Sequence, residues 1–134
     1  MKGIFSALMV PYNLDGSINE KGLRELVRHN IDVMKVDGLY VGGSTGENFM
    51  ISTEEKKEVF RIAMDEAKNE VQMMAQVGSI NVKESVELGK YATELGYPCL
   101  SAVTPFYYKF SFAEIKEYYE TIVRETQNNM VIYS

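Results

Sequence analysis

Short apolar segments alternate along this chain with longer segments in which apolar residues recur at helical spacing. Five of the apolar segments suit β-strands, and they cover 4–11, 38–42, 71–77, 99–104 and 130–133. We expect each strand to be apolar on both faces, which is typical of parallel strands that are covered on both sides.

Each segment between the expected strands begins with a polar residue that suits a helix N-cap. These residues are Asn19, Ser52 with Glu55, Asn81 with Glu84, and Ser111 with Glu114. A serine followed three residues later by a glutamate predicts a capping box, in which each side chain bonds the backbone of the other residue. Gly96 follows the third segment, where a glycine readily adopts the left-handed conformation that ends a helix. The pattern therefore predicts four helices.

Strand and helix repeat at intervals of roughly 30 residues, which is the spacing of the βαβ unit. Two architectures use this unit: the doubly wound open sheet and the closed eight-stranded barrel. The first strand leads into Val10, Pro11 and Tyr12 rather than into a G-x-G-x-x-G turn, and no G-x-x-x-x-G-K-[ST] loop is present. Instead, polar side chains follow several strands, at Ser44, Thr45, Ser79, Thr104, Tyr133 and Ser134. Barrel enzymes carry their catalytic groups at this end of the strands, so we expect an α/β fold of the TIM (β/α)8 type.

A complete barrel of this type has about 250 residues, whereas this chain has 134. We expect residues 1–134 to form one partial barrel domain, truncated after the fifth strand, with parallel strands 1–5 and four helices. A strand at the very end of the chain would leave an apolar edge unpaired, so we expect the rest of the barrel to be absent from the sequence or supplied by another chain.

Composition narrows the classes of partner. The formal net charge is -5, and acidic and basic residues are interspersed without a basic stripe, so we expect neither nucleic acid nor a membrane surface as a partner. No apolar run is long enough to span a bilayer, and no signal-peptide layout precedes the first strand. Cys99 is the only cysteine, which favours a reducing, cytoplasmic location. We expect Cys99 to be a small buried strand residue, and His29, on the first helix, to be structural or exposed.

Three motifs in register carry a family resemblance. Residues 42–48 read Gly-Gly-Ser-Thr-Gly-Glu-Asn, residues 101–108 read Ser-Ala-Val-Thr-Pro-Phe-Tyr-Tyr, and Ile132 precedes Tyr133. These segments resemble the strand-2, strand-4 and strand-5 motifs of the superfamily of class I aldolases that includes N-acetylneuraminate lyase and dihydrodipicolinate synthase. The opening segment 3–11 fits the family's first strand. Ser44 and the segment 105–112 resemble the lyase branch, since the synthases usually have a threonine at the first position and Pro-Tyr-Tyr-Asn in the second.

The resemblance implies a reversible retro-aldol cleavage of N-acetylneuraminate, a sialic acid, into pyruvate and N-acetylmannosamine. A lysine amine forms a Schiff base with the keto acid and provides the electron sink for C–C cleavage. No metal or other cofactor is implied. The resemblance places this lysine at the end of strand 6, beyond Ser134. We expect the lysines of this chain to be exposed and protonated on helices, turns or the chain start, so the 134 residues alone should be inactive.

The resemblance also implies roles for four residues. Ser44 and Thr45 would hold the substrate carboxylate on a glycine-rich turn, although the residues alone also fit an ordinary βα turn. Tyr133 would move protons beside the Schiff base, a task that suits a hydroxyl that both donates and accepts. Tyr107 would reach into a neighbouring subunit and complete a proton relay with Ser44 and Tyr133, which requires a homo-oligomer, typically a tetramer. For Glu47 a general acid or base role is an alternative, but we expect it to orient the turn through backbone hydrogen bonds.

Two other readings stay open at this point. One is another member of the same superfamily, such as a dihydrodipicolinate synthase or a different 2-keto acid aldolase or dehydratase. The other is a non-catalytic half-barrel that self-associates to cover its open sheet edge.

Overall fold

The sheet consists of five parallel strands in the order β1-β2-β3-β4-β5. The computed structural model describes residues 1–133; Ser134, which the sequence placed after the fifth strand, lies outside the described residues. The strands are β1 (Phe5–Ala7), β2 (Gly38–Val41), β3 (Gln72–Gln76), β4 (Cys99–Val103) and β5 (Asn129–Tyr133). Every neighbouring pair is also consecutive in the sequence, so the strand order never reverses.

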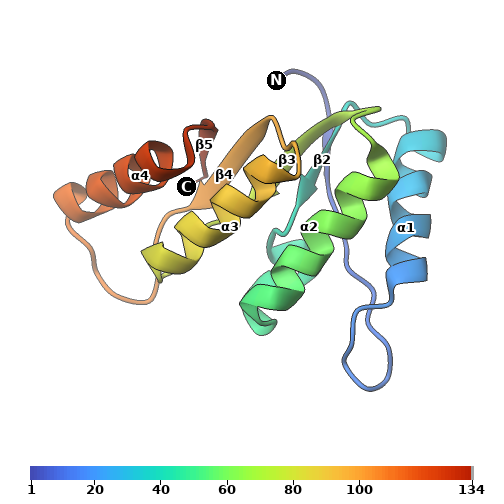
Figure 1. Ribbon diagram of the computed structural model, residues 1–134, viewed down its shortest axis with the longest axis horizontal. Coiled ribbons are helices and arrows are strands. Elements are labelled where there is room, and N and C mark those ends of the chain that lie inside the picture. Colours follow the sequence, from blue (N-terminus) through green and yellow to red (C-terminus); the bar gives the residue numbers. More distant parts are fainter. Residues whose placement is uncertain (134) are drawn as a thin grey trace.

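One helix follows each of the first four strands. The long helices are α1 (Glu20–Arg28), α2 (Thr53–Ala67), α3 (Val82–Glu94) and α4 (Phe112–Thr126). Short helical turns are η1 (His29–Val33), η2 (Ser44–Gly46) and η3 (Asn48–Met50). Figure 1 shows the four long helices side by side over one face of the sheet. A doubly wound sheet has helices on both faces, whereas this arrangement is the N-terminal half of a TIM barrel.

The helices begin where the sequence predicts. Ser52 and Ser111 each form a complete capping box with the glutamate three residues later, and Asn19 caps α1 by accepting a hydrogen bond from Gly22 N–H at 2.9 Å. Asn81 caps α3, but Glu84 does not reach back to the cap. Its carboxylate instead accepts hydrogen bonds from Lys56, Thr53 and Ser79, because α2 packs directly beside α3.

The first strand is shorter than predicted. The expectation was 4–11, whereas β1 ends at Ala7. Leu8 N–H still bonds the Tyr40 carbonyl, but Pro11 has no N–H to donate and its carbonyl accepts from Asn19 N–H. The chain therefore leaves the sheet and forms a loop that the bridge between Tyr12 and Ile18 closes.

The two faces of the sheet differ, which corrects the expectation of strands that are apolar on both faces. The face under the helices is apolar and fully buried, with Leu39, Val41, Met73, Ala75, Leu100 and Ala102 in its core. The opposite, inner face carries the polar side chains of Tyr40, Gln76 and Ser101, one on each of β2, β3 and β4, among apolar residues such as Met74 and Val103. This face lines a cavity rather than packing against helices, so polar side chains can occur on it.

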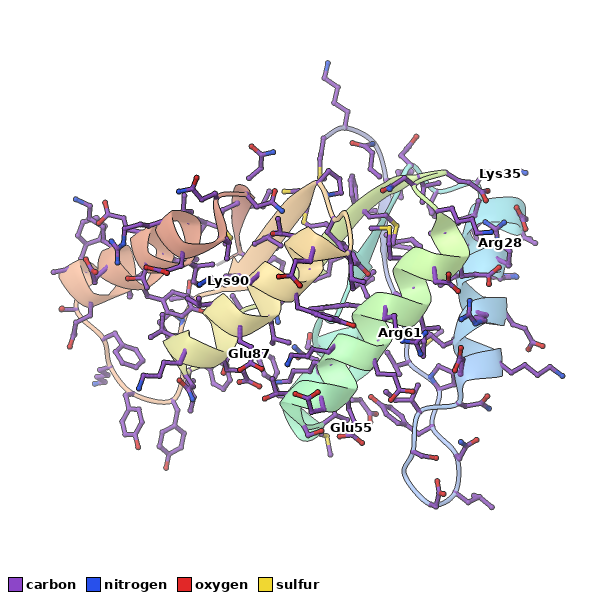
Figure 2. The ribbon with its side chains drawn as sticks, in the orientation of Figure 1. Arg28, Lys35, Glu55, Arg61, Glu87 and Lys90 are labelled. Atoms are coloured by element: carbon purple, nitrogen blue, oxygen red, sulfur yellow. The ribbon has the colours of Figure 1, made fainter. Side chains whose placement is uncertain are left out.

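Charged side chains cover the outer surface of the helices. Figure 2 shows Arg28, Arg61, Glu87 and Lys90 projecting from α1, α2 and α3. Two lysines depart from the expected exposure. Only 8% of the Lys56 side chain is accessible, and its Nζ lies 2.8 Å from Glu84 Oε1; 19% of the Lys57 side chain is accessible. None of the helices within residues 1–133 is both long and apolar enough to span a bilayer.

Cys99 and His29 lie where the sequence predicts. Cys99 is buried in β4, and its burial raises the pKa of the thiol, which leaves less of the reactive thiolate. His29 is exposed in η1, the continuation of α1. By strand alternation Cys99 lies on the same face of β4 as Ser101 and Val103, whereas His29 lies in the helical layer.

Candidate active site

The inner face of the sheet forms a hollow of about 330 Å³ at the carboxyl ends of the strands. The residues that line it are Phe5, Ala7, Tyr40, Gly43, Ser44, Thr45, Phe49, Met74, Gln76, Ser101, Val103, Val131 and Tyr133. Ser44 and Thr45, on the turn after β2, and Tyr133, at the end of β5, therefore lie around one cavity, as the sequence predicts. None of the lining side chains within residues 1–133 carries a formal charge, and none is a lysine.

Two glycines shape the turn that carries Ser44 and Thr45. Gly42 has φ +80°, and a Cβ there would lie 2.7 Å from the Phe60 ring. A Cβ on Gly43 would lie 2.7 Å from the Tyr40 ring. Only glycine tolerates both the left-handed backbone and such close approach. The sequence Gly-Gly before Ser44 is thus a requirement of packing as well as of the turn.

Backbone hydrogen bonds hold this turn in shape. Gly46 N–H donates to the Gly43 carbonyl at 3.0 Å, and Glu47 N–H donates to the Ser44 carbonyl at 2.9 Å. Tyr12 Oη donates to the Gly46 carbonyl at 2.9 Å. Glu47 itself is left-handed, with φ +57°, and its side chain is exposed. Glu47 therefore orients the turn through its backbone, as expected from the sequence.

The turn offers hydrogen-bond donors to a ligand. Ser44 and Thr45 are the first two residues of η2, where backbone N–H groups have no partner within the helical turn. Both side chains are exposed, so two hydroxyls accompany the two N–H groups. A set of neutral donors on an uncharged wall suits a carboxylate.

Tyr133 ends β5 on the opposite side of the hollow. Its ring lies 6.1 Å from the Tyr40 ring, centroid to centroid, and is 58% exposed. Tyr40 Oη donates to Ser101 Oγ at 3.4 Å. Burial raises the pKa of Tyr40, despite the opposing effect of the Ser101 hydrogen bond, so the Tyr40 phenol keeps its proton near neutral pH.

Tyr107 lies apart from this hollow. Its side chain is 86% exposed and packs edge-on against Tyr108, with ring centroids 4.9 Å apart. The residue has φ +77°, which is unusual for a tyrosine. Neighbouring aromatics form a partial cluster, with ring centroids of Phe106 and Phe49 4.9 Å apart and those of Tyr108 and Phe110 6.2 Å apart. The structure thus brings Ser44, Thr45 and Tyr133 together and leaves the role of Tyr107 a prediction.

Three polar residues that line the hollow were not among the site residues predicted from the sequence. Tyr40, Gln76 and Ser101 occupy inner-face positions of β2, β3 and β4. Strand alternation was a signal for two of them, because Gln76 lies two positions after Met74 and Ser101 two positions before Val103 on the same strand face. Within residues 1–133, no group of three or more His, Cys, Asp or Glu residues could hold a metal ion.

The sequence and the fold of this chain are both similar to those of known proteins. The N-acetylneuraminate lyase of Fusobacterium nucleatum is 81% identical to this chain over 134 residues, which is 100% of the chain and 46% of the relative. The chain therefore spans about half the length of the curated relatives that it matches.

Two solved structures share the fold closely. CdNal from Clostridium difficile in complex with mannosamine has a TM-score of 0.98 and 66% identity, with 100% of this chain and 46% of that one covered. The Fusobacterium nucleatum N-acetylneuraminate lyase complexed with pyruvate has a TM-score of 0.95 and 79% identity, with 100% and 45% covered. A model of the dihydrodipicolinate synthetase family matches residues 1–134. This chain therefore belongs to the dihydrodipicolinate synthetase family.

Proposed function

We propose that residues 1–134 are the N-terminal part of a lyase that cleaves N-acetylneuraminate into pyruvate and N-acetylmannosamine. The observation that supports this most directly is the shared hollow of Ser44, Thr45 and Tyr133 at the carboxyl ends of parallel strands. Identity of 81% over all 134 residues to part of an N-acetylneuraminate lyase favours this branch over the dihydrodipicolinate synthases.

In this proposal the turn at Ser44 and Thr45 binds the carboxylate of the keto acid. Its neutral donors stabilise an anion without an opposing charge in the hollow. The apolar part of the wall, including Met74 and Val103, suits the short carbon chain of pyruvate. A relative complexed with pyruvate is consistent with a ligand of this size.

Tyr133 moves protons during formation of the imine and cleavage of the C–C bond. Its phenol is accessible from the hollow, and a hydroxyl can donate to one oxygen while accepting from another group. The Schiff-base lysine comes from the part of the barrel that follows Tyr133, because no lysine lines the hollow within residues 1–133. No metal or other cofactor takes part in this scheme.

We also propose a cytoplasmic homotetramer. Tyr107, exposed on the loop before α4, would enter the active site of a neighbouring subunit there. A single, buried cysteine suits a reducing compartment. In the same proposal, residues 1–134 form one partial barrel domain, which the rest of the barrel completes.

A hybrid protein tests the proposal. In this hybrid lyase, residues 1–134 replace the matching segment of the Fusobacterium nucleatum lyase, which supplies the rest of the barrel. We expect release of pyruvate from N-acetylneuraminate, and trapping of a pyruvate adduct by borohydride. A folded hybrid lyase without either activity would contradict the proposed function.

Tyr133→Phe tests the assigned proton transfer in the same protein. Loss of the hydroxyl removes the acid–base group, so we expect kcat to fall by about 100-fold or more. Tyr91→Phe, on the outer helix α3, is the matched control and should leave kcat unchanged. A kcat for Tyr133→Phe within a few-fold of the control would remove Tyr133 from the mechanism.

A further inference from the structure

Gln76 is a buried amide at the end of β3, with only 2% of its surface exposed. It lies on the inner face of the sheet and lines the same hollow as Ser44 and Thr45. In register it pairs with Ser101 of β4. Gln76 is therefore the amide within the wall of the candidate active site.

The side chain of Gln76 connects two backbone segments. Its Oε1 accepts a hydrogen bond from Gly78 N–H, and its Nε2 donates to the carbonyls of Gly42 at 3.3 Å and Gly78 at 3.4 Å. The orientation of the amide follows from these partners, because a flipped amide would face its NH2 group toward an N–H and its oxygen toward a carbonyl. Every polar atom of the buried side chain thus has a partner.

Gly42 is the residue at which the substrate-binding turn leaves β2. It has φ +80°, a conformation that glycine enters and leaves freely. Within the described part of the chain, Gln76 is the side chain that bonds the Gly42 carbonyl. The bond therefore constrains the glycine at which the segment that presents Ser44 and Thr45 begins.

Gly78 supplies the space that this side chain needs. A Cβ at Gly78 would lie 2.6 Å from Gln76 Oε1 and 2.5 Å from Val103 N. The chain thus has glycine at both backbone segments that the Gln76 amide joins. Because Gly42 and Gly78 both accommodate the local backbone, the hydrogen bonds of the Gln76 amide are a specific feature of this site rather than a consequence of general packing.

We propose that Gln76 is a positioning residue that fixes the turn at Ser44 and Thr45 for the carboxylate of the substrate. This inference rests on the proposed function and adds to it a residue that acts through the Gly42 backbone. The amide holds the turn in its binding conformation before the ligand arrives, which lowers the cost of ordering it on binding.

Gln76→Met in the hybrid lyase tests the proposal, because methionine keeps the length and bulk of the side chain but removes both hydrogen-bonding groups. We expect the KM for pyruvate in the condensation direction to rise roughly tenfold, the effect of one or two lost hydrogen bonds. The KM for N-acetylmannosamine and kcat should change much less. Hydrogen–deuterium exchange of the unliganded segment 42–47 should become faster.

Gln72→Met is the matched control, since it makes the same change on the same face of the same strand. Gln72 bonds the Lys2 backbone at the opposite end of the sheet. This variant should leave the KM for pyruvate and the exchange of segment 42–47 unchanged. Gln76→Glu keeps the acceptor for Gly78 N–H but loses the amide donor to Gly42. Its charge would itself repel a carboxylate ligand, so if the methionine variant does not fold, the exchange rate of segment 42–47 in Gln76→Glu provides the test.

Two results would overturn the inference. One is an unchanged exchange rate of segment 42–47 in the folded Gln76 variants, which would show that the amide does not hold the turn. The other is an equal loss in both KM values and in kcat, which would show a general structural effect. If the unsubstituted hybrid lyase is inactive, the proposed function fails, and the exchange measurement still decides whether Gln76 fixes the turn.

Discussion

At the scale of single residues, Lys56 and Glu84 form the most buried ion pair among the described residues, with 8% and 17% of their side chains accessible. Thr53 and Ser79 also donate to the Glu84 carboxylate, at 2.9 and 2.5 Å. Since Ser79 follows β3 and Thr53 begins α2, this network joins elements at the end of the sheet that carries the hollow.

Lys56→Met in the hybrid lyase should lower the free energy of unfolding by about 3 kcal/mol, because it leaves the Glu84 carboxylate buried without its cation. Lys57→Met is the control. Lys57 pairs with Glu54 and Glu87 at the surface, where such pairs contribute about 1 kcal/mol or less. Urea denaturation of both variants at neutral pH measures the difference, and equal losses would show that burial of the pair has no special effect.

Glu84 should also make stability depend on pH. Burial raises the pKa of its carboxyl, but the hydrogen bonds from Lys56, Ser79 and Thr53 outweigh burial, so the pKa lies below the ordinary value of 4.5. The folded state therefore favours the charged form, and this stabilisation is present above pH 4.5 and is lost as the pH falls through the lowered pKa.

Glu84→Gln in the hybrid lyase removes this dependence. The difference in unfolding free energy between the unsubstituted protein and Glu84→Gln should be largest near neutral pH and shrink between about pH 5 and pH 3. Urea denaturation across this range provides the measurement. A difference that stays constant over the range would show that the Glu84 pKa is not lowered by folding.

At the scale of elements, the helix starts depend on local hydrogen bonds. Ser111 Oγ accepts from Glu114 N–H at 3.3 Å, and the Glu114 carboxylate accepts from Ser111 N–H at 2.7 Å. Ser111→Ala in the hybrid lyase should cost about 1 kcal/mol, whereas Ser111→Gly, a tolerated N-cap, should cost only a few tenths. Thermal unfolding of the two variants distinguishes loss of the cap from loss of the side chain in general, and a larger loss for the glycine variant would contradict the capping role.

Such local features explain why the sequence predicts the helices so well. A capping box involves residues three positions apart. Ser52 and Ser111 therefore predict where their helices begin from the local sequence alone. The end of β1 depends instead on the loop bond between the Pro11 carbonyl and Asn19 N–H, and the contacts of the Glu84 carboxylate depend on partners such as Lys56 on another helix. Periodicity contains no information on these contacts.

Some residues of the candidate site can likewise be predicted from the local sequence, and others depend on distant contacts. Ser44, Thr45 and Tyr133 lie in motifs that resemble a known family, so the sequence predicts them together. Gln76 lies in no such motif, and its importance follows only from the spatial approach of β3 to the turn after β2. A glutamine in an apolar strand was nevertheless a signal, because a buried amide requires partners.

At the scale of the whole molecule, apolar surface remains on β5 and at the start of the chain. Ile4 is 73% exposed, Ile132 61% and Val131 41%. In Figure 1, β5 and α4 form one end of the row of elements and α1 forms the other. A barrel would cover these surfaces with its remaining strands and helices, and the chain alone would cover them by self-association.

Complementation in solution tests whether the rest of the barrel or a second copy of the chain covers this apolar surface. These 134 residues and the remaining segment of the Fusobacterium nucleatum lyase are produced as separate polypeptides and then mixed. We expect a stable complex that cleaves N-acetylneuraminate and forms a borohydride-trapped adduct with pyruvate, on the added segment only. The chain by itself should form no adduct, because its lysines lie outside the hollow and protonated amines are poor nucleophiles. A compact homodimer of the 134 residues that does not bind the added segment would instead favour the self-associating half-barrel. Substitution of the exposed Ile132 would then test whether β5 forms the dimer interface.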